Sequence, residues 1–121
     1  MKPHTEIQVK RIYEAASAED GLRVLVDRVW PRGISKEEAA LDAWEKDLAP
    51  TTALRKWFGH KPERFDEFRQ RYRQELQAQT DVLDALLARA KGKKISLLFG
   101  AKDTEHNNAV VLQEVLKERM R

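Results

Sequence analysis

Short apolar runs alternate with longer stretches of helical periodicity along this chain of 121 residues. Hydrophobic and polar positions alternate over residues 7–12, whereas residues 22–27 and 94–99 are nearly continuous apolar runs. Such patterns are typical of β-strands, and continuous apolarity favours a strand covered on both faces. The pattern therefore predicts three strands, with the second in a central position of the sheet. Residues 15–21 between the first two strands predict a turn or one helical turn that ends at Gly21.

The first helix is predicted from a capping box. Ser35 and Glu38 have the spacing in which the serine hydroxyl accepts from the N3 amide and the glutamate returns to the serine amide. A helix should therefore run from about residue 36 to about residue 48. Trp44 lies three residues after Leu41 and four before Leu48, which predicts a buried helix face.

Four further helices follow. A short helix opens after Pro50 and ends at Gly59, which suits a left-handed C-terminal position. The next, 62–77, carries a stripe with spacings of three and four: Phe65, Phe68, Tyr72 and Leu76. A helix at about 81–90 comes before the third strand, and Asp103 or Thr104 is expected to cap the last helix, which runs to about residue 119.

Strands separated by helical stretches indicate an α/β protein. We expect residues 1–121 to form one domain, with a small parallel or mixed sheet of about three to four strands covered by helices on both faces. The chain has no cysteine, which fits a reducing compartment, and no apolar stretch approaches the roughly 20 residues needed to cross a bilayer. These features, together with a charged N-terminus that lacks a signal-like apolar region, predict a cytoplasmic protein with no membrane association.

Charge is abundant and nearly balanced. The chain has 23 basic and 20 acidic residues, a formal net charge of +3, and the two signs are interleaved. A nucleic-acid-binding protein usually presents a face of one sign. Nucleic acid is therefore the less favoured partner, although the outer arginines of residues 62–77 could contact phosphates.

The densest polar segment is DRVWPRG, residues 27–33, directly after the second strand. Loops at the carboxyl ends of strands are where open α/β proteins place their ligands. Arg28 and Arg32 are candidate ligands for an anion there. Trp30 between them is a candidate wall of the site, although it can equally be a packing anchor.

The junction after the third strand, residues 100–107, should lie at the same edge if the strands are parallel. Lys102 is predicted to stand just before a helix whose first amides are unpaired, which favours an anion. Together with the two arginines it could hold a phosphate or carboxylate, and Asn107 is a further candidate contact. The alternative is that Asp27 and Asp103 pair with these cations and the loops only hold the sheet together.

General acid–base chemistry has four candidates. His60 lies in a turn between helices, and His106 is predicted in the first turn of the last helix. Either could pair with Asp27 or Asp103, because a carboxylate fixes the imidazole tautomer and raises its basicity. The alternative is that each histidine caps or packs.

Other chemistry lacks a sequence signal. There is no His-Glu-x-x-His metal motif, no Gly-x-Gly-x-x-Gly or P-loop pattern and no Gly-x-Ser-x-Gly. We therefore predict no metal site and no cofactor.

Several separate segments resemble one family. They are residues 23–33, 44–50, 54–60, 65–72 and 97–107, and they include tryptophans at rare positions. In these motifs the chain is similar, over about residues 7–117, to the YeaO-like family of small bacterial proteins, a family of unknown function. The family commonly shows Tyr-Ala where this chain has Phe99-Gly100, so a tyrosine hydroxyl is missing here.

The resemblance implies a compact cytoplasmic α/β domain of unestablished activity. The family pattern contains these polar or site positions: Asp27, Arg28, Trp30, Pro31, Arg32, Gly33, Lys46, Asp47, Arg55, His60, Lys102, Asp103, His106 and Asn107. Our first hypothesis is an enzyme or binding domain for an anionic small molecule, phosphorylated or nucleotide-like. The alternatives are a nucleic-acid-binding accessory and a protein-interaction module without catalysis; the oligomeric state stays open.

Overall fold

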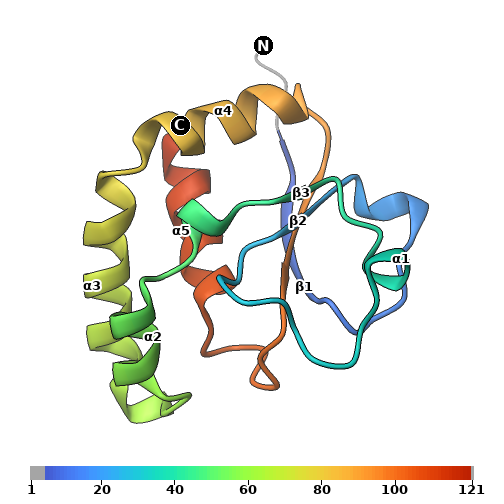
Figure 1. Ribbon diagram of the computed structural model, residues 1–121. Coiled ribbons are helices and arrows are strands. Elements are labelled where there is room, and N and C mark those ends of the chain that lie inside the picture. Colours follow the sequence, from blue (N-terminus) through green and yellow to red (C-terminus); the bar gives the residue numbers. More distant parts are fainter. Residues whose placement is uncertain (1–4, 121) are drawn as a thin grey trace.

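The computed structural model describes residues 5–120 and contains a parallel sheet of four strands (Figure 1). The strand order is β1-β4-β2-β3, and each neighbouring pair runs parallel. The strands are β1 Ile7–Arg11, β2 Leu22–Leu25, β3 Ala43–Trp44 and β4 Ile95–Phe99. The predicted α/β class is thus confirmed, and β3 is a strand that the hydrophobic pattern did not reveal. His4, in the N-terminal arm, lies outside the described residues.

Helices lie on both faces of the sheet, as predicted, but very unequally (Figure 1). The longer helices gather on one side of the sheet, whereas the short α1 and the 3-10 turn η1, Ala18–Asp20, lie on the other. The helices are α1 Lys36–Ala39, α2 Thr52–Phe58, α3 Phe65–Gln77, α4 Thr80–Ala90 and α5 Asn108–Arg119. The 3-10 turns η2, Lys46–Leu48, and η3, Pro62–Arg64, precede α2 and α3.

The main core lies between the sheet and the longer helices. Val24 and Leu97 from the central strands meet Phe68 of α3 and Leu112 of α5, all of them buried. The stripe predicted on the third helix is confirmed, since Phe65, Phe68, Tyr72 and Leu76 are all buried. A smaller apolar cluster on the opposite face contains Ile12, Leu25, Ala39 and Leu98, with Trp30 and Trp44 packed against it.

The prediction of one helix over residues 36–48 is wrong. The capping box of Ser35 and Glu38 is present, but α1 ends at Ala39 because Ala40 adopts a left-handed conformation with φ 47°. The chain then adds β3 to the free edge of β2, pairing Ala43 with Val24 and Trp44 with Leu25. Trp44 therefore lies on a strand, half-buried, and its indole Nε1 donates to the Asp27 carbonyl at 2.7 Å.

The predicted start of the last helix is also wrong. The N-cap of α5 is Asn107, whose side-chain oxygen accepts from the Val110 amide at 3.0 Å. Asp103 instead accepts from the amides of Glu105 and His106 within a separate turn. His106 and Lys102 consequently belong to the loop that precedes α5, and Lys102 does not stand at a helix N-terminus.

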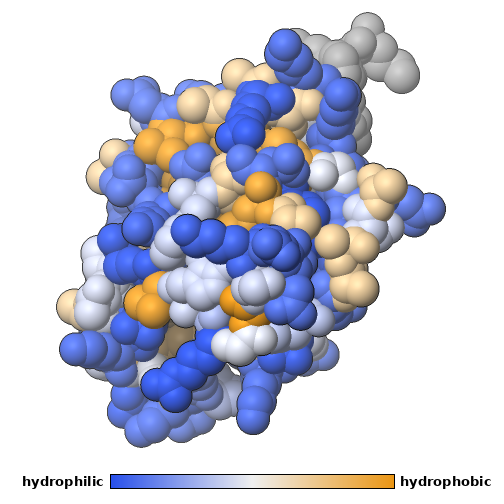
Figure 2. All heavy atoms as spheres, turned by 45° about the vertical axis from the view of Figure 1, so that its right-hand side comes forward, coloured by the Kyte–Doolittle hydropathy of each residue, from blue (hydrophilic) through white to orange (hydrophobic). Residues whose placement is uncertain are grey.

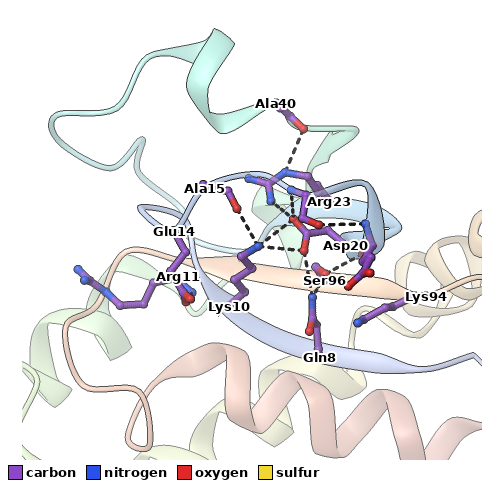
Figure 3. A network of polar contacts seen from close by, with 12 residues as sticks. Gln8, Lys10, Arg11, Glu14, Ala15, Asp20, Arg23, Ala40, Lys94 and Ser96 are labelled. Atoms are coloured by element: carbon purple, nitrogen blue, oxygen red, sulfur yellow. Dashed lines mark hydrogen bonds and ion pairs between the residues drawn. The ribbon is translucent and has the colours of Figure 1, made fainter.

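The second face of the sheet carries a buried polar network centred on Asp20 (Figure 3). Its carboxylate accepts from Lys10 Nζ at 2.9 Å and from Arg23 Nη1 at 2.5 Å. Ser96 donates to the Asp20 carbonyl and accepts from Gln8. Burial raises the pKa of Asp20, but the hydrogen bonds from Lys10, the Ser17 amide and Arg23 outweigh it and hold the pKa at about 2. The carboxylate is bonded within the protein, so this network fastens η1 to the sheet.

The outer edge of β1 is partly covered by side chains. Glu6 and Ile12 bond to β4, so Ile7, Val9 and Arg11 direct their backbone groups away from the sheet. Gln113 of α5 donates to the Ile7 carbonyl at 2.7 Å, and the Arg11 amide donates to Glu14 at 3.2 Å.

Candidate functional site

A cleft of about 340 Å³ lies where the chain leaves the carboxyl ends of the strands. It is built mainly by the loop after β2, by α2 with the turn that follows it, and by the segment between β4 and α5. Tyr13 after β1, Phe68 of α3 and Asn108 at the start of α5 complete the lining. In Figure 1 these segments lie at the lower end of the sheet. The lining residues are Tyr13, Asp27, Arg28, Val29, Trp30, Pro31, Arg32, Pro50, Arg55, Phe58, His60, Phe68, Gly100, Ala101, Asn107 and Asn108.

Asp27 links the two strand-to-loop junctions. Its Oδ2 accepts from the Gly100 amide at 2.8 Å, and its Oδ1 accepts from Asn108 Nδ2 at 3.3 Å. Asn108 also donates to the Val26 carbonyl at 2.8 Å. Burial raises the pKa of the Asp27 carboxyl, although these hydrogen bonds and the nearby His60 and Arg55 favour its charged form. Asp27 therefore joins the ends of β2 and β4 to the start of α5.

Arg28 and Trp30 line the cleft, and both already donate hydrogen bonds within the protein. Arg28 donates through Nε to the Pro50 carbonyl at 3.0 Å and through Nη2 to the Ala49 carbonyl at 3.3 Å. The Trp30 indole donates to the Ile34 carbonyl at 2.8 Å, and its ring meets that of Trp44 edge-on at 5.4 Å. Both residues hold the loop in place, which leaves Trp30 only its ring for contact with a ligand.

Three side chains supply uncommitted cationic or titratable groups to the cleft. Arg32, Arg55 and His60 are exposed, and no hydrogen bond or ion pair joins their side chains to another group in residues 5–120. His60 follows Gly59 in a left-handed turn, with φ 57° and 54° respectively, and its ring lies 6.3 Å from that of Phe58. The turn after α2 thus brings His60 to the same cleft as Asp27.

The other predicted acid–base pair lies elsewhere. His106 Nδ1 is 2.9 Å from Asp103 Oδ2, and the imidazole packs edge-on against Phe65 at 5.2 Å. Backbone amides of Glu105 and His106 lower the pKa of Asp103. Neither residue lines the cleft, and the exposed Lys102 does not line it either.

Asn107 lines the cleft, yet its amide is used in the fold. Besides capping α5, it donates to the Asp103 carbonyl at 2.9 Å, and the residue is almost fully buried. Of the predicted site residues, the structure thus gathers Asp27, Arg28, Trp30, Arg32, His60 and Asn107, and it leaves out Lys102, Asp103 and His106.

Sequence reasoning missed Tyr13 and Asn108 and did not assign Arg55 to the site. Arg55 could have been found from its presence in the family pattern. Asn108 could have been found because it directly follows residues 100–107, a predicted junction. Tyr13 follows β1, so the rule that places ligands at the carboxyl ends of parallel strands could have pointed to it, although no motif singled it out.

Metal ligands do not gather in the described residues. Across residues 5–120 no three histidine, aspartate or glutamate side chains come together in a way that could hold a metal ion. In the same part of the chain, none of the helices has both the length and the apolar character needed to span a bilayer.

The fold and the cleft define a small α/β protein with a cleft at the carboxyl edge of a parallel sheet. The chain belongs to the family described as "Inactive DUF488-N3 subclade", whose model matches residues 6–121. It is 43% identical to the uncharacterized protein YeaO of Escherichia coli over 111 residues, which are 92% of this chain and 96% of that protein.

An uncharacterized protein of Mycobacterium tuberculosis is 38% identical over 120 residues, 98% of this chain and all of that protein. The resemblance to the YeaO-like family is therefore confirmed. No solved structure gives a significant match to the chain.

Proposed function

We propose that the cleft binds a small anionic molecule, phosphorylated or nucleotide-like, and does so without chemical turnover. The observation that carries this proposal is the charge of the cleft. Within residues 5–120, Arg32 and Arg55 line it without an internal partner, and Asp27 is the one acidic residue among the lining side chains. An anion can satisfy the free guanidinium groups through charge-assisted hydrogen bonds.

The arrangement of the acid–base candidates favours binding over catalysis. Asp103 and His106 pair with each other outside the cleft, and Asp27 is hydrogen-bonded to Gly100 and Asn108. His60 remains as a titratable group without a protein partner in the described chain. The family description names its subclade inactive, which supports a binding role for this chain as well.

The alternative partners receive less support. The outer arginines of α3 are paired with carboxylates: Arg69 and Arg73 with Glu114, Arg71 with Glu67, and Arg73 also with Glu118. Because their guanidinium groups are already in ion pairs, these arginines are less available to nucleic-acid phosphates. For a protein partner, Figure 2 shows that hydrophobic residues on one face lie in separate groups between hydrophilic ones, which offers no continuous apolar surface there.

The test is a thermal-shift screen with inorganic phosphate, sugar phosphates, nucleotides and short oligonucleotides. We expect a small anion to raise the melting temperature of the wild type, since a ligand at a hundred times its Kd adds about 2.7 kcal/mol of stability. Arg32→Ala and Arg55→Ala should each weaken binding by roughly 1.5–3 kcal/mol, the usual worth of a charge-assisted hydrogen bond.

Lys56→Ala is the matched control, because Lys56 is an exposed cation on the same helix and does not line the cleft. Equal loss of affinity in the Lys56 variant would indicate nonspecific charge attraction. Binding of oligonucleotides alone, with a steep salt dependence, would favour the nucleic-acid alternative.

The absence of cysteine leads us to propose a cytoplasmic location.

A further inference from the structure

We infer that Tyr13 is a stacking platform at the cleft, so that the preferred ligand is a planar, unsaturated ring that carries a carboxylate or phosphate. This inference rests on the proposed binding of an anion and adds the chemical class of the remainder of the ligand. Tyr13 comes from the turn after β1, a segment that none of the predicted site residues belongs to.

The ring of Tyr13 is exposed although it is a large apolar group. Within residues 5–120 the large hydrophobic side chains that remain exposed are Tyr13, at 41%, and Val29, at 55%, and both line the cleft. Exposed apolar side chains that gather at one groove are typical of a surface that a ligand or partner covers. Tyr13 and Val29 therefore lie in the same cleft as Arg32 and Arg55, the two arginines without an internal partner in the described residues.

Tyr13 is also held in place from two sides. Its hydroxyl donates to the Arg32 carbonyl at 2.6 Å, which ties the ring to the loop that carries a candidate anion ligand. The Arg11 guanidinium lies over the ring, 4.9 Å from its centroid, and donates to the Ala101 carbonyl at 2.9 Å. A ring fixed in this way loses little conformational entropy when a ligand stacks on it.

Arg11 occupies one face of the Tyr13 ring. Its guanidinium lies 4.9 Å from the ring centroid, and Arg11 does not line the cleft, whereas Tyr13 does. We infer that a ligand in the cleft meets the part of the ring that Arg11 does not cover. Offset stacking or an edge-to-face contact is the arrangement that aromatic rings prefer.

The phenylalanine and tryptophan walls of the cleft are less accessible. Phe58 stacks on Phe68 with 4.4 Å between ring centroids, and both side chains are almost fully buried. Trp30 is half-buried and packs against Trp44. Among the phenylalanine, tryptophan and tyrosine side chains of the cleft, Tyr13 is thus the one best exposed for a new ring contact, and its hydroxyl is bonded to the Arg32 segment that would hold the anion.

The experiment compares matched pairs of ligands that differ in the ring. Benzoate is paired with cyclohexanecarboxylate, and phenyl phosphate with cyclohexyl phosphate, so that each pair keeps its anion and replaces the planar aromatic ring by a saturated ring of six carbons. Amide resonances of Gly100 and Asn108 report occupancy of the cleft in an NMR titration, which gives Kd for each compound. The carboxylate and phosphate pairs together show which anion the site takes.

For the wild type we expect the aromatic member of the preferred pair to bind roughly three- to tenfold tighter than its saturated partner, in line with the usual worth of an aromatic contact. Tyr13→Leu should bring this ratio close to one while the affinity for the saturated acid stays similar. Tyr13→Phe keeps the ring and should keep the preference. Intermolecular NOEs between ligand ring protons and the Tyr13 ring in the wild type test the contact without any substitution.

The outcomes separate this inference from the proposed function. If saturated and aromatic acids bind the wild type equally, or if the preference persists in Tyr13→Leu, the role of Tyr13 is overturned while anion binding stands. NOEs to other side chains but none to Tyr13 would overturn it as well. If none of the four compounds shifts the Gly100 and Asn108 resonances, the inference fails, and the proposed function fails with it only if the thermal-shift screen is negative as well.

Discussion

Arg28 and Arg32 belong to one loop yet have opposite surroundings. Arg28 donates two hydrogen bonds to the carbonyls of Pro50 and Ala49, both of which belong to buried residues. Arg32 is exposed and lines the cleft without an internal partner in residues 5–120. Charge within a loop therefore serves two purposes here, one to hold the backbone and the other to remain available to a ligand.

This difference predicts unequal effects of substitution. Arg28→Ala should destabilise the protein by about 1–3 kcal/mol, because it leaves two buried carbonyls without their charged donors. Arg32→Ala should change the free energy of unfolding by no more than about 0.5 kcal/mol, as is usual for exposed positions. Urea denaturation of both variants checks the prediction, and equal losses would show that Arg32 also has a structural role.

Among the secondary-structure elements, α2 matters most for the cleft because it carries Arg55 and leads into His60. Thr51 begins this helix and fastens it to α3. Its hydroxyl accepts from the Leu54 amide at 3.3 Å and donates to Glu75 Oε2 at 2.7 Å, and its amide donates to Glu75 Oε1 at 3.0 Å. The helix start and its attachment thus depend on one threonine.

Thr51→Ala should therefore cost about 1–2 kcal/mol of stability through loss of the cap and of the bond to Glu75. Thr52→Ala is the control, because Thr52 is the neighbouring exposed threonine within α2 and has no such capping role. Thermal or urea denaturation should show a clear loss for Thr51→Ala and a change within about 0.5 kcal/mol for Thr52→Ala. Similar losses in both would contradict the importance of the cap.

Elements with a strong local signal were predictable, and those fixed by distant contacts were not. The capping box at Ser35, the stop at Gly59 and the apolar stripe of α3 are local, and all three are present. By contrast, β3 forms because it pairs with the edge of β2. The sequence did not reveal this strand, because the spacing of Leu41, Trp44 and Leu48 also fits a helix. Asn107 replaced Asp103 as the cap of α5 because Asp103 forms its own turn.

The candidate site was likewise predictable only as far as local rules reach. The rule that parallel strands end at one edge was enough to expect the segments after β2 and β4 at the same edge of the sheet, and the hydrogen bond from the Gly100 amide to Asp27 joins them there. It could not show that Arg28 is bound by carbonyls more than twenty positions later in the chain, nor that Tyr13 reaches the cleft. Such contacts depend on tertiary packing, which one sequence does not display.

For the whole molecule, stability depends on two unlike faces of one sheet. The face toward the longer helices is apolar, whereas the opposite face combines a small apolar cluster with the network around Asp20. Asp20 and Arg23 are 3% and 4% exposed, so their charges are removed from water together. Loss of one partner leaves the other buried and uncompensated.

Acid should reduce the stability that the network around Asp20 contributes to the fold. The pKa of Asp20 falls from 3.8 to about 2 on folding, so its ionised form stabilises the folded state above pH 3.8, and this contribution is lost as the pH falls toward 2. Asp20→Asn should cost about 3 kcal/mol at pH 7. The difference from the wild type should shrink by roughly 2 kcal/mol between pH 5 and pH 2.

Asp66→Asn is the control for this pH series, since the Asp66 side chain is 96% exposed and pairs only loosely with Arg69 at 3.5 Å. Urea denaturation across the pH range should show no comparable change for that variant. A stability difference for Asp20→Asn that stays constant with pH would mean that its charge is not what holds the network together.

The edge of β1 has a consequence for how this protein behaves at high concentration. An unpaired edge strand can accept a strand from a neighbouring molecule and so start aggregation. Here Gln113 occupies the Ile7 carbonyl and Glu14 the Arg11 amide, so an incoming strand would have to displace both side chains before it could bond along β1. The two side chains thereby make the addition of a further strand along β1 less favourable.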